Sequence, residues 1–126
     1  MRKAPLRVVI VGAGPAGLYL AYLLKRARPD FQIEIIEQNP SDATFGFGLA
    51  FSERALEFLK QQDAETWAAL QPSFEFWSDS ILYLNGSEIR IDGMGYAGIG
   101  RLRLLEILQA RVGLDRSLGA IHHGKP

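Results

Sequence analysis

Three glycines near the N-terminus and a carboxylate further along have the spacing of a phosphate-binding turn. The glycines are Gly12, Gly14 and Gly17, and Glu37 lies twenty residues past the last of them. In such a turn the first glycine allows the tight bend, the second allows backbone to approach a pyrophosphate, and the third allows close helix–strand packing. Glu37 is placed to accept hydrogen bonds from a ribose diol, and its charge would repel the 2′-phosphate of NADP.

The elements around these residues support that interpretation. Val8–Val11 is a β-branched run without alternation, which predicts a strand buried on both faces. Pro15 suits the first turn of a helix, whose N–H groups and dipole would then face the phosphates. The helix is expected to stop at residues 28–30, before a second strand that ends at Glu37. A βαβ unit over residues 8–37 therefore favours dinucleotide binding over a glycine turn without a ligand.

Further helices and a hairpin are predicted beyond this unit. Ser52 reads as the N-cap of one helix, and a short helix is expected at residues 64–70. Asn85-Gly86 between two apolar runs predicts a β-hairpin with a type I′ turn. The glycines of residues 93–100 predict a flexible connection, and a last helix is expected at residues 102–112.

Composition excludes several classes of function. The 126 residues fit one domain, and the net charge of +0 offers no basic excess for nucleic acid. The absence of cysteine excludes disulfides, thiolate metal sites and cysteine nucleophiles, and His122-His123 has no partner at metal spacing. The uncharged run of residues 8–24 is interrupted by the glycine cluster, which argues against a signal peptide or membrane span. A cytoplasmic location is expected.

Three ordered motifs resemble one enzyme family. Residues 11–18 resemble the start of FAD-dependent hydroxylases of the para-hydroxybenzoate hydroxylase type. Residues 44–52 and 95–105 resemble the branch typified by salicylyl-CoA 5-hydroxylase and anthraniloyl-CoA monooxygenase. The resemblance implies an α/β fold of the glutathione-reductase type: a Rossmann-like FAD-binding βαβ unit, incomplete, with an inserted β-hairpin. The choice of FAD over NAD rests on this resemblance, because both cofactors use the same turn.

The resemblance also assigns roles to individual residues. The first glycine loop is expected to bind the pyrophosphate of FAD. The carboxylate of Glu37 is expected to bind the adenosine ribose, and the next residue is expected to lie near the adenosine. A second glycine loop is expected to pass close to the flavin. An arginine at a helix start is expected to contact FAD, as a cation beside a dianionic pyrophosphate. In that order these residues are Gly12, Gly14, Pro15, Ala16 and Gly17, then Glu37 and Gln38, then Gly46 and Gly48, and lastly Arg101. No catalytic acid, base or metal ligand is predicted.

The implied parent enzyme hydroxylates an aromatic substrate with NAD(P)H and O2, and an aromatic acyl-CoA thioester is the expected substrate. Residues 1–112 would form the N-terminal part of its FAD-binding domain. Residues 113–126 show no pattern and predict a tail where the reading frame is truncated or shifted, so that the C-terminal part of the polypeptide is missing and the fragment alone is inactive. Two alternatives stay open: an NAD-binding dehydrogenase or reductase domain, and a non-functional fragment that binds nothing.

Overall fold

A computed structural model describes residues 4–40, 43, 46–113 and 119–123. The chain divides into two compact units. Unit 1 comprises Met1–Phe45 with Leu104–Pro126, and unit 2 comprises Gly46–Arg103. Thr44 and Phe45 of the second resembling motif lie outside the described residues.

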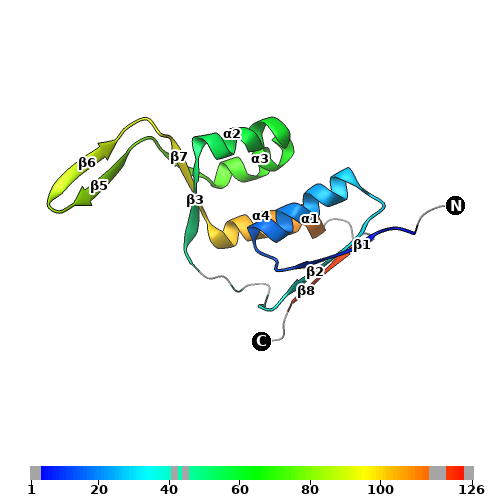
Figure 1. The fold of residues 1–126 in the computed structure, drawn as a ribbon. Coiled ribbons are helices and arrows are strands. Elements are labelled where there is room, and N and C mark those ends of the chain that lie inside the picture. Colours follow the sequence, from blue (N-terminus) through cyan, green and yellow to red (C-terminus); the bar gives the residue numbers. More distant parts are fainter. Residues whose placement is uncertain (1–3, 41–42, 44–45, 114–118, 124–126) are drawn as a thin grey trace. The chain divides into compact units, whose positions relative to one another are not determined.

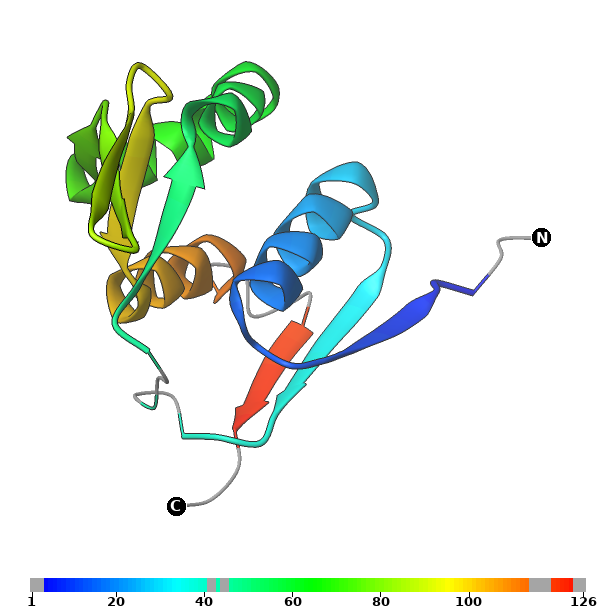
Figure 2. The same cartoon turned by 60° about the vertical axis from the view of Figure 1, so that its left-hand side comes forward.

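Unit 1 is built on a parallel sheet of three strands in the order β1-β2-β8 (Figure 2). The strands are β1 (Arg7–Val11), β2 (Gln32–Glu37) and β8 (Gly119–His123), and helix α1 (Pro15–Ala27) connects the first two. Strand β8 pairs with β2 on the side opposite to β1, as the third strand does in one half of a Rossmann fold. The predicted βαβ unit and its α/β fold class are confirmed.

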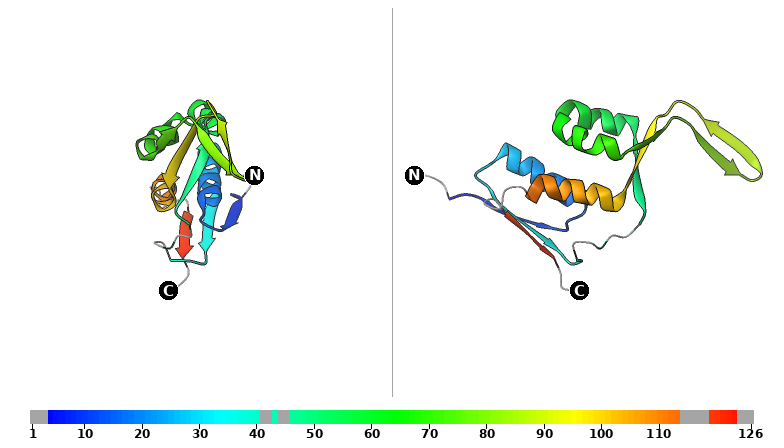
Figure 3. Two further views of the ribbon diagram at one scale, coloured as in Figure 1. Left: turned by 90° about the vertical axis from the view of Figure 1, so that its left-hand side faces the viewer. Right: turned by 180° about the vertical axis from the view of Figure 1, so that it is seen from behind.

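Helices α1 and α4 (Arg101–Gly113) lie side by side over the same face of this sheet (Figures 1 and 3). Lys25 Nζ of α1 donates a hydrogen bond to the Val112 carbonyl of α4 at 3.2 Å. Arg111 donates to the Tyr22 hydroxyl and stacks over that ring at 4.7 Å from its centroid. The core of unit 1 includes the apolar side chains Leu18, Ala21, Ile33 and Ile35.

Strand β1 is not buried on both faces, which corrects the sequence-based expectation. Ile10 is 9% exposed, whereas Val9 is 48% and Val11 is 84% exposed. Among the described strands β1 lies at the edge of the sheet, and α1 and α4 cover only the face that holds Ile10. The β-branched run therefore predicted the strand correctly but not its surroundings.

The segment after residue 112, expected to be unpatterned, contains strand β8. It pairs in parallel with β2, with Ile33 opposite Gly119 and Glu37 opposite His123. A five-residue strand of this composition carries little local signal, because strand formation depends mainly on the neighbouring strand. The side chains of the two histidines lie outside the described residues.

Unit 2 combines an antiparallel sheet in the order β3-β7-β4 with two helices and a projecting hairpin (Figure 1). Its sheet strands are β3 (Gly48–Ser52), β4 (Glu75–Trp77) and β7 (Tyr96–Gly100). Its helices are α2 (Glu53–Gln62) and α3 (Ala64–Leu70), followed by a short 3₁₀ turn η1 (Gln71–Ser73). The hairpin consists of β5 (Ser80–Leu84) and β6 (Ser87–Ile91).

Short sequence patterns correctly predicted several elements of unit 2. Ser52 caps α2, its hydroxyl accepting a hydrogen bond from the Ala55 amide at 3.3 Å. Asn85 and Gly86 both adopt positive φ, 49° and 77°, as a type I′ hairpin turn requires. The predicted Ser52 cap, the short helix at residues 64–70 and the hairpin are therefore confirmed.

The flexible connection expected over residues 93–100 is wrong, because Tyr96–Gly100 forms β7, the central strand of the sheet. Gly98 makes room for an aromatic ring, since an added Cβ would lie 3.1 Å from the indole of Trp77. The second glycine loop, expected to include Gly48, likewise ends earlier, because Gly48 is the first residue of β3. Glycine in these strands serves close packing.

Candidate dinucleotide-binding site

The turn between β1 and α1 depends on two of its glycines for its shape. Gly12 has a φ of +106°, and its amide donates to the Ile36 carbonyl at 2.7 Å. At Gly17 an added Cβ would overlap the Gly12 carbonyl oxygen. The first glycine therefore permits the bend, and the third permits the helix to lie against the end of β1.

Gly14 is different, because the protein itself does not require a glycine there. Its φ of −72° and ψ of 178° are open to any residue. An added Cβ would meet no atom within 4 Å. The backbone at Gly14 therefore faces open space, where a group outside the polypeptide can approach it.

The start of α1 carries the features of an anion-binding site. Pro15 is its first residue, and the first turn contains no acidic side chain. The Leu18 amide donates to the Gly14 carbonyl at 3.0 Å and so closes that turn. The amides of Ala16 and Gly17 come before the first intrahelical donor, which leaves them directed at the N-terminal end. Together with the helix dipole, these amides can bind a phosphate group.

Glu37 at the end of β2 is bonded directly to the glycine turn. Its Oε2 accepts a hydrogen bond from the Ala13 amide at 2.8 Å. Its Oε1 accepts two more, from the Asn39 amide and the Asn39 side-chain Nδ2, each at 2.9 Å. The carboxylate that the sequence predicted as a ribose ligand thus also fixes the turn.

These donors hold the pKa of Glu37 below its ordinary value of 4.5. The Ala13 amide is the main cause and the Asn39 amide the next, while partial burial acts in the opposite direction. Glu37 is therefore ionised near neutral pH and remains an acceptor. Gln38, predicted to lie near the adenosine, follows it and is exposed.

Ala13 and Asn39 were not singled out in the sequence as partners of Glu37. The signal for Asn39 was its position two residues after a strand-ending carboxylate, where Asn favours turns and local hydrogen bonds. Ala13 carries no side-chain signal, because its contribution is a backbone amide.

The other predicted cofactor residues gather in unit 2. Gly46 has a φ of +89°, and Gly48 pairs with Gly100 across the β3–β7 ladder. A Cβ at Gly48 would lie 2.8 Å from the Ile99 carbonyl oxygen. Arg101, the first residue of α4, donates its amide to the Phe47 carbonyl at 3.0 Å. The second glycine loop and Arg101 therefore meet at one corner of unit 2, while the first glycine loop and Glu37 meet in unit 1.

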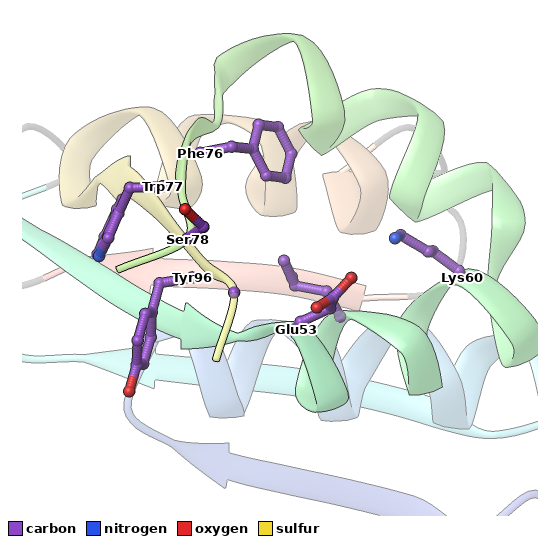
Figure 4. A pocket seen from close by; sticks show the side chains of 8 residues that line it. Glu53, Lys60, Phe76, Trp77, Ser78 and Tyr96 are labelled. Atoms are coloured by element: carbon purple, nitrogen blue, oxygen red, sulfur yellow. The ribbon is translucent and has the colours of Figure 1, made fainter. Parts of the chain in front are cut away.

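Unit 2 also contains an open cavity of about 390 Å³, shown in Figure 4. Trp77 and Tyr96 form one wall, and their stacked rings have centroids 5.8 Å apart. The carboxylate of Glu53 and the ammonium of Lys60 project from α2 on the other side (Figure 4). None of the predicted cofactor residues lines this cavity.

Neither a metal-binding cluster nor a membrane-spanning helix is present in the part of the chain that the structure describes. Within it, no group of three or more His, Cys, Asp or Glu side chains is arranged to hold a metal ion. No helix there has the length and apolar character needed to cross a membrane.

The parallel sheet, the glycine turn and its link to Glu37 define a dinucleotide-binding α/β unit. A family model described as lycopene cyclase protein matches residues 7–119, from the start of β1 to the first residue of β8. The chain belongs to this family.

Known relatives agree with the resemblance to hydroxylases. Salicyloyl-CoA 5-hydroxylase from Streptomyces sp is 41% identical over 106 residues, which is 84% of this chain and 20% of the relative. The 3-hydroxy-4-methyl-anthranilyl-[aryl-carrier protein] 5-monooxygenase from Streptosporangium sibiricum is 23% identical over 84% of this chain and 30% of its own length. The resemblance to the N-terminal segment of FAD-dependent aromatic hydroxylases is therefore confirmed.

A solved structure shows the same fold. The P. aeruginosa protein PqsL, in complex with 2-aminobenzoylacetate, superposes with a TM-score of 0.76 at 14% identity. The match covers 94% of this chain and 33% of PqsL. The chain thus spans about a fifth to a third of the lengths of these three proteins.

Proposed function

We propose that the chain binds the ADP half of FAD, as the N-terminal part of a flavoprotein monooxygenase. The observation that carries the proposal is the hydrogen bond of 2.8 Å from the Ala13 amide to Glu37 Oε2. It joins a phosphate-binding turn to a carboxylate able to accept from a ribose, so both groups of an adenosine diphosphate have partners in one unit.

The residues present fit such a ligand. The open space at Gly14 admits a pyrophosphate next to the backbone, and the start of α1 offers free amides without a competing acidic side chain. The ionised Glu37 disfavours a 2′-phosphate on the ribose, which supports FAD or NAD over NADP as the dinucleotide.

In unit 2, the proposed roles fall to Gly46, Gly48 and Arg101. The strand start at Gly48 brings backbone without a side chain close to β7, and Arg101 follows directly on that strand. A guanidinium at this position would contact FAD, since it presents several donors to an anionic cofactor. The glycines would pass close to the ribityl chain and the flavin ring.

For the parent enzyme we propose hydroxylation of an aromatic substrate, preferably an aromatic acyl-CoA thioester, with NAD(P)H and O2 as co-substrates. The family description names a cyclase, but a relative with 41% identity over 84% of this chain is a CoA-ester hydroxylase, and this favours hydroxylation. Bound FAD would supply the oxygen chemistry, while this part of the chain binds and orients its ADP end. The substrate residues would lie in a further part of the polypeptide, and a cytoplasmic location stays a prediction.

Calorimetric titration of the full chain with FAD, ADP and NADH tests the proposal. We expect heat of binding for FAD and for ADP, because the contacts lie at the adenosine diphosphate. Binding of NADH with no response to FAD would instead support the dehydrogenase alternative. No heat with any of the three would support a chain that binds nothing.

A further inference from the structure

We infer that the open cavity of unit 2 binds a small organic cation, specifically a methylated ammonium group, through Glu53 and the rings of Trp77 and Tyr96. The inference goes beyond the proposed function, because none of the residues proposed to bind the dinucleotide lines this cavity. A volume of about 390 Å³ is sufficient for such a ligand.

Glu53 is held at the cavity by the backbone around Gly95. The Glu53 amide donates to the Gly95 carbonyl at 2.9 Å, and the Gly95 amide donates in turn to the Ser78 carbonyl at 3.4 Å. Gly95 has a φ of +62°, and a Cβ there would overlap the Glu53 carboxylate. Glycine at this position therefore makes room for the carboxylate in the cavity wall.

The carboxylate of Glu53 is available to a ligand. It is exposed, and it makes no hydrogen bond or ion pair with any of the residues that the structure describes. Lys60, the other charged residue of the lining, lies about two turns further along α2. Its Nζ is 4.8 Å from the centroid of the Trp67 ring and 4.0 Å from Glu57 Oε2, so its charge already has partners. The lining therefore favours a positive charge next to Glu53.

The aromatic wall favours the same charge. Trp77 and Tyr96 are paired across the β4–β7 ladder, and their ring planes are inclined to each other by 19°. Phe76, whose ring is exposed, adds a third aromatic side chain to the lining (Figure 4). The face of an aromatic ring is negative, so it attracts a cation placed over it, and Trp does so most strongly.

An anion is less suited to the cavity, although α2 begins there. Two amides of its first turn already have protein partners, since Glu53 N donates to Gly95 and the Ala55 amide donates to the Ser52 hydroxyl at 3.3 Å. The carboxylate of Glu53 would in addition repel an anion.

The small number of acceptors favours a methylated cation. A primary ammonium has three N–H donors, each of which needs an acceptor once it leaves water. Besides the Glu53 carboxylate, the side chains of the lining offer only the hydroxyls of Ser78 and Tyr96 as acceptors. A trimethylammonium group has no N–H donor, and its methyl groups can pack against the rings.

The test uses choline as the probe, and the control is its neutral analogue in which carbon replaces the nitrogen. Titration of the full chain followed by NMR gives both affinities. We expect choline to bind about five-fold or more tightly, because the carboxylate and the ring faces attract only the charged molecule. The methyl signal of choline should move upfield, since an aromatic ring shields protons above its face. Equal affinities for the two molecules, or no binding of choline, would overturn the inference.

Two substitutions with opposite effects locate the site. Glu53→Gln should weaken choline binding about three-fold or more and leave the neutral analogue unaffected, because it removes charge without changing size. Lys60→Gln should strengthen choline binding, because it removes a positive charge from the lining. The matched control is Glu88→Gln, which removes an exposed carboxylate of the hairpin outside the cavity and should have no effect. Equal choline affinity in the natural chain and in Glu53→Gln would overturn the inference.

The trimethylammonium group occurs in free solutes and in the headgroup of phosphatidylcholine. Sedimentation with phosphatidylcholine vesicles distinguishes these sources. We expect the chain to remain in the supernatant, which assigns a free solute to the cavity. Sedimentation that is abolished by Glu53→Gln would assign the lipid headgroup to the same cation site.

Discussion

The Ala13 amide donates to Glu37 Oε2 at 2.8 Å across 24 residues of sequence, which ties the glycine turn to the end of the second strand. The turn is thereby held in shape by the same carboxylate that is proposed to bind ribose. Glu37 consequently has two roles that can be separated by experiment, one in stability and one in binding.

The stabilising role of Glu37 predicts a dependence on pH. Its pKa is lower in the folded chain than its ordinary value of 4.5, so its contribution to stability is complete above that value. The contribution is lost as the pH falls through the lower, folded pKa, because protonation removes the acceptor charge that the Ala13 and Asn39 donors stabilise. Urea unfolding of the natural chain and of Glu37→Gln, from neutral to acidic pH, measures this difference.

We expect the difference in free energy of unfolding between the two chains to become smaller as the pH falls below 4.5. A gap of constant size down to the lowest pH at which the chain folds would show that Glu37 makes no charge-dependent contribution. Lys60→Gln on α2, which belongs to unit 2 and not to the unit of the glycine turn, serves as a control for the general effect of removing a charge.

Gly17→Ala should destabilise unit 1, because the new Cβ would overlap the carbonyl oxygen of Gly12. Relieving that overlap requires the helix to move away from the turn, at a cost of about 1–3 kcal/mol by analogy with overpacked cores. Urea unfolding followed by circular dichroism gives the value. A variant as stable as the natural chain would contradict the close helix–strand contact.

Gly48→Ala should destabilise unit 2 for a related reason. The added Cβ would lie 2.8 Å from the backbone oxygen of Ile99, so the β3–β7 ladder would have to open. The expected loss is again about 1–3 kcal/mol in the free energy of unfolding. Gly100→Ala is a matched control, since Gly100 pairs with Gly48 but its own Cβ would meet nothing within 4 Å. Equal losses in both variants would contradict this account.

Local patterns in the sequence predicted the elements whose signals are local. The strand–turn–helix–strand order, the Ser52 cap and the Asn85-Gly86 hairpin depend on residues adjacent in the chain, and all three are confirmed. The likeness to FAD-dependent hydroxylases could also be recognised from three short motifs, and the relatives agree with it.

The features that were missed depend on partners distant in the sequence. Strand β7 was mistaken for a flexible connection because it is rich in glycine, and the contact of Gly98 with Trp77 that explains one of these glycines exists only in the fold. Strand β8 is defined by its pairing with β2. The exposure of Val11 depends on how much of the sheet is covered, which a β-branched run does not reveal. In the site, the hydrogen bonds of Glu37 to Ala13 and Asn39 form only in the folded turn. A backbone amide that donates a hydrogen bond cannot be recognised from the residue type, because every residue except proline has one.

The most direct test of the central claim is the affinity for FAD of the natural chain and of Gly14→Ala. A Cβ at Gly14 meets no protein atom within 4 Å and the backbone there is ordinary, so the fold should keep its stability. A pyrophosphate bound next to that backbone would collide with the methyl group, and we expect FAD affinity to fall at least about ten-fold, which corresponds to about 1.4 kcal/mol. Gly113→Ala, another glycine with open space around its Cβ position, should leave the affinity unchanged. Equal FAD affinity in the natural chain and in Gly14→Ala would contradict the proposed pyrophosphate site.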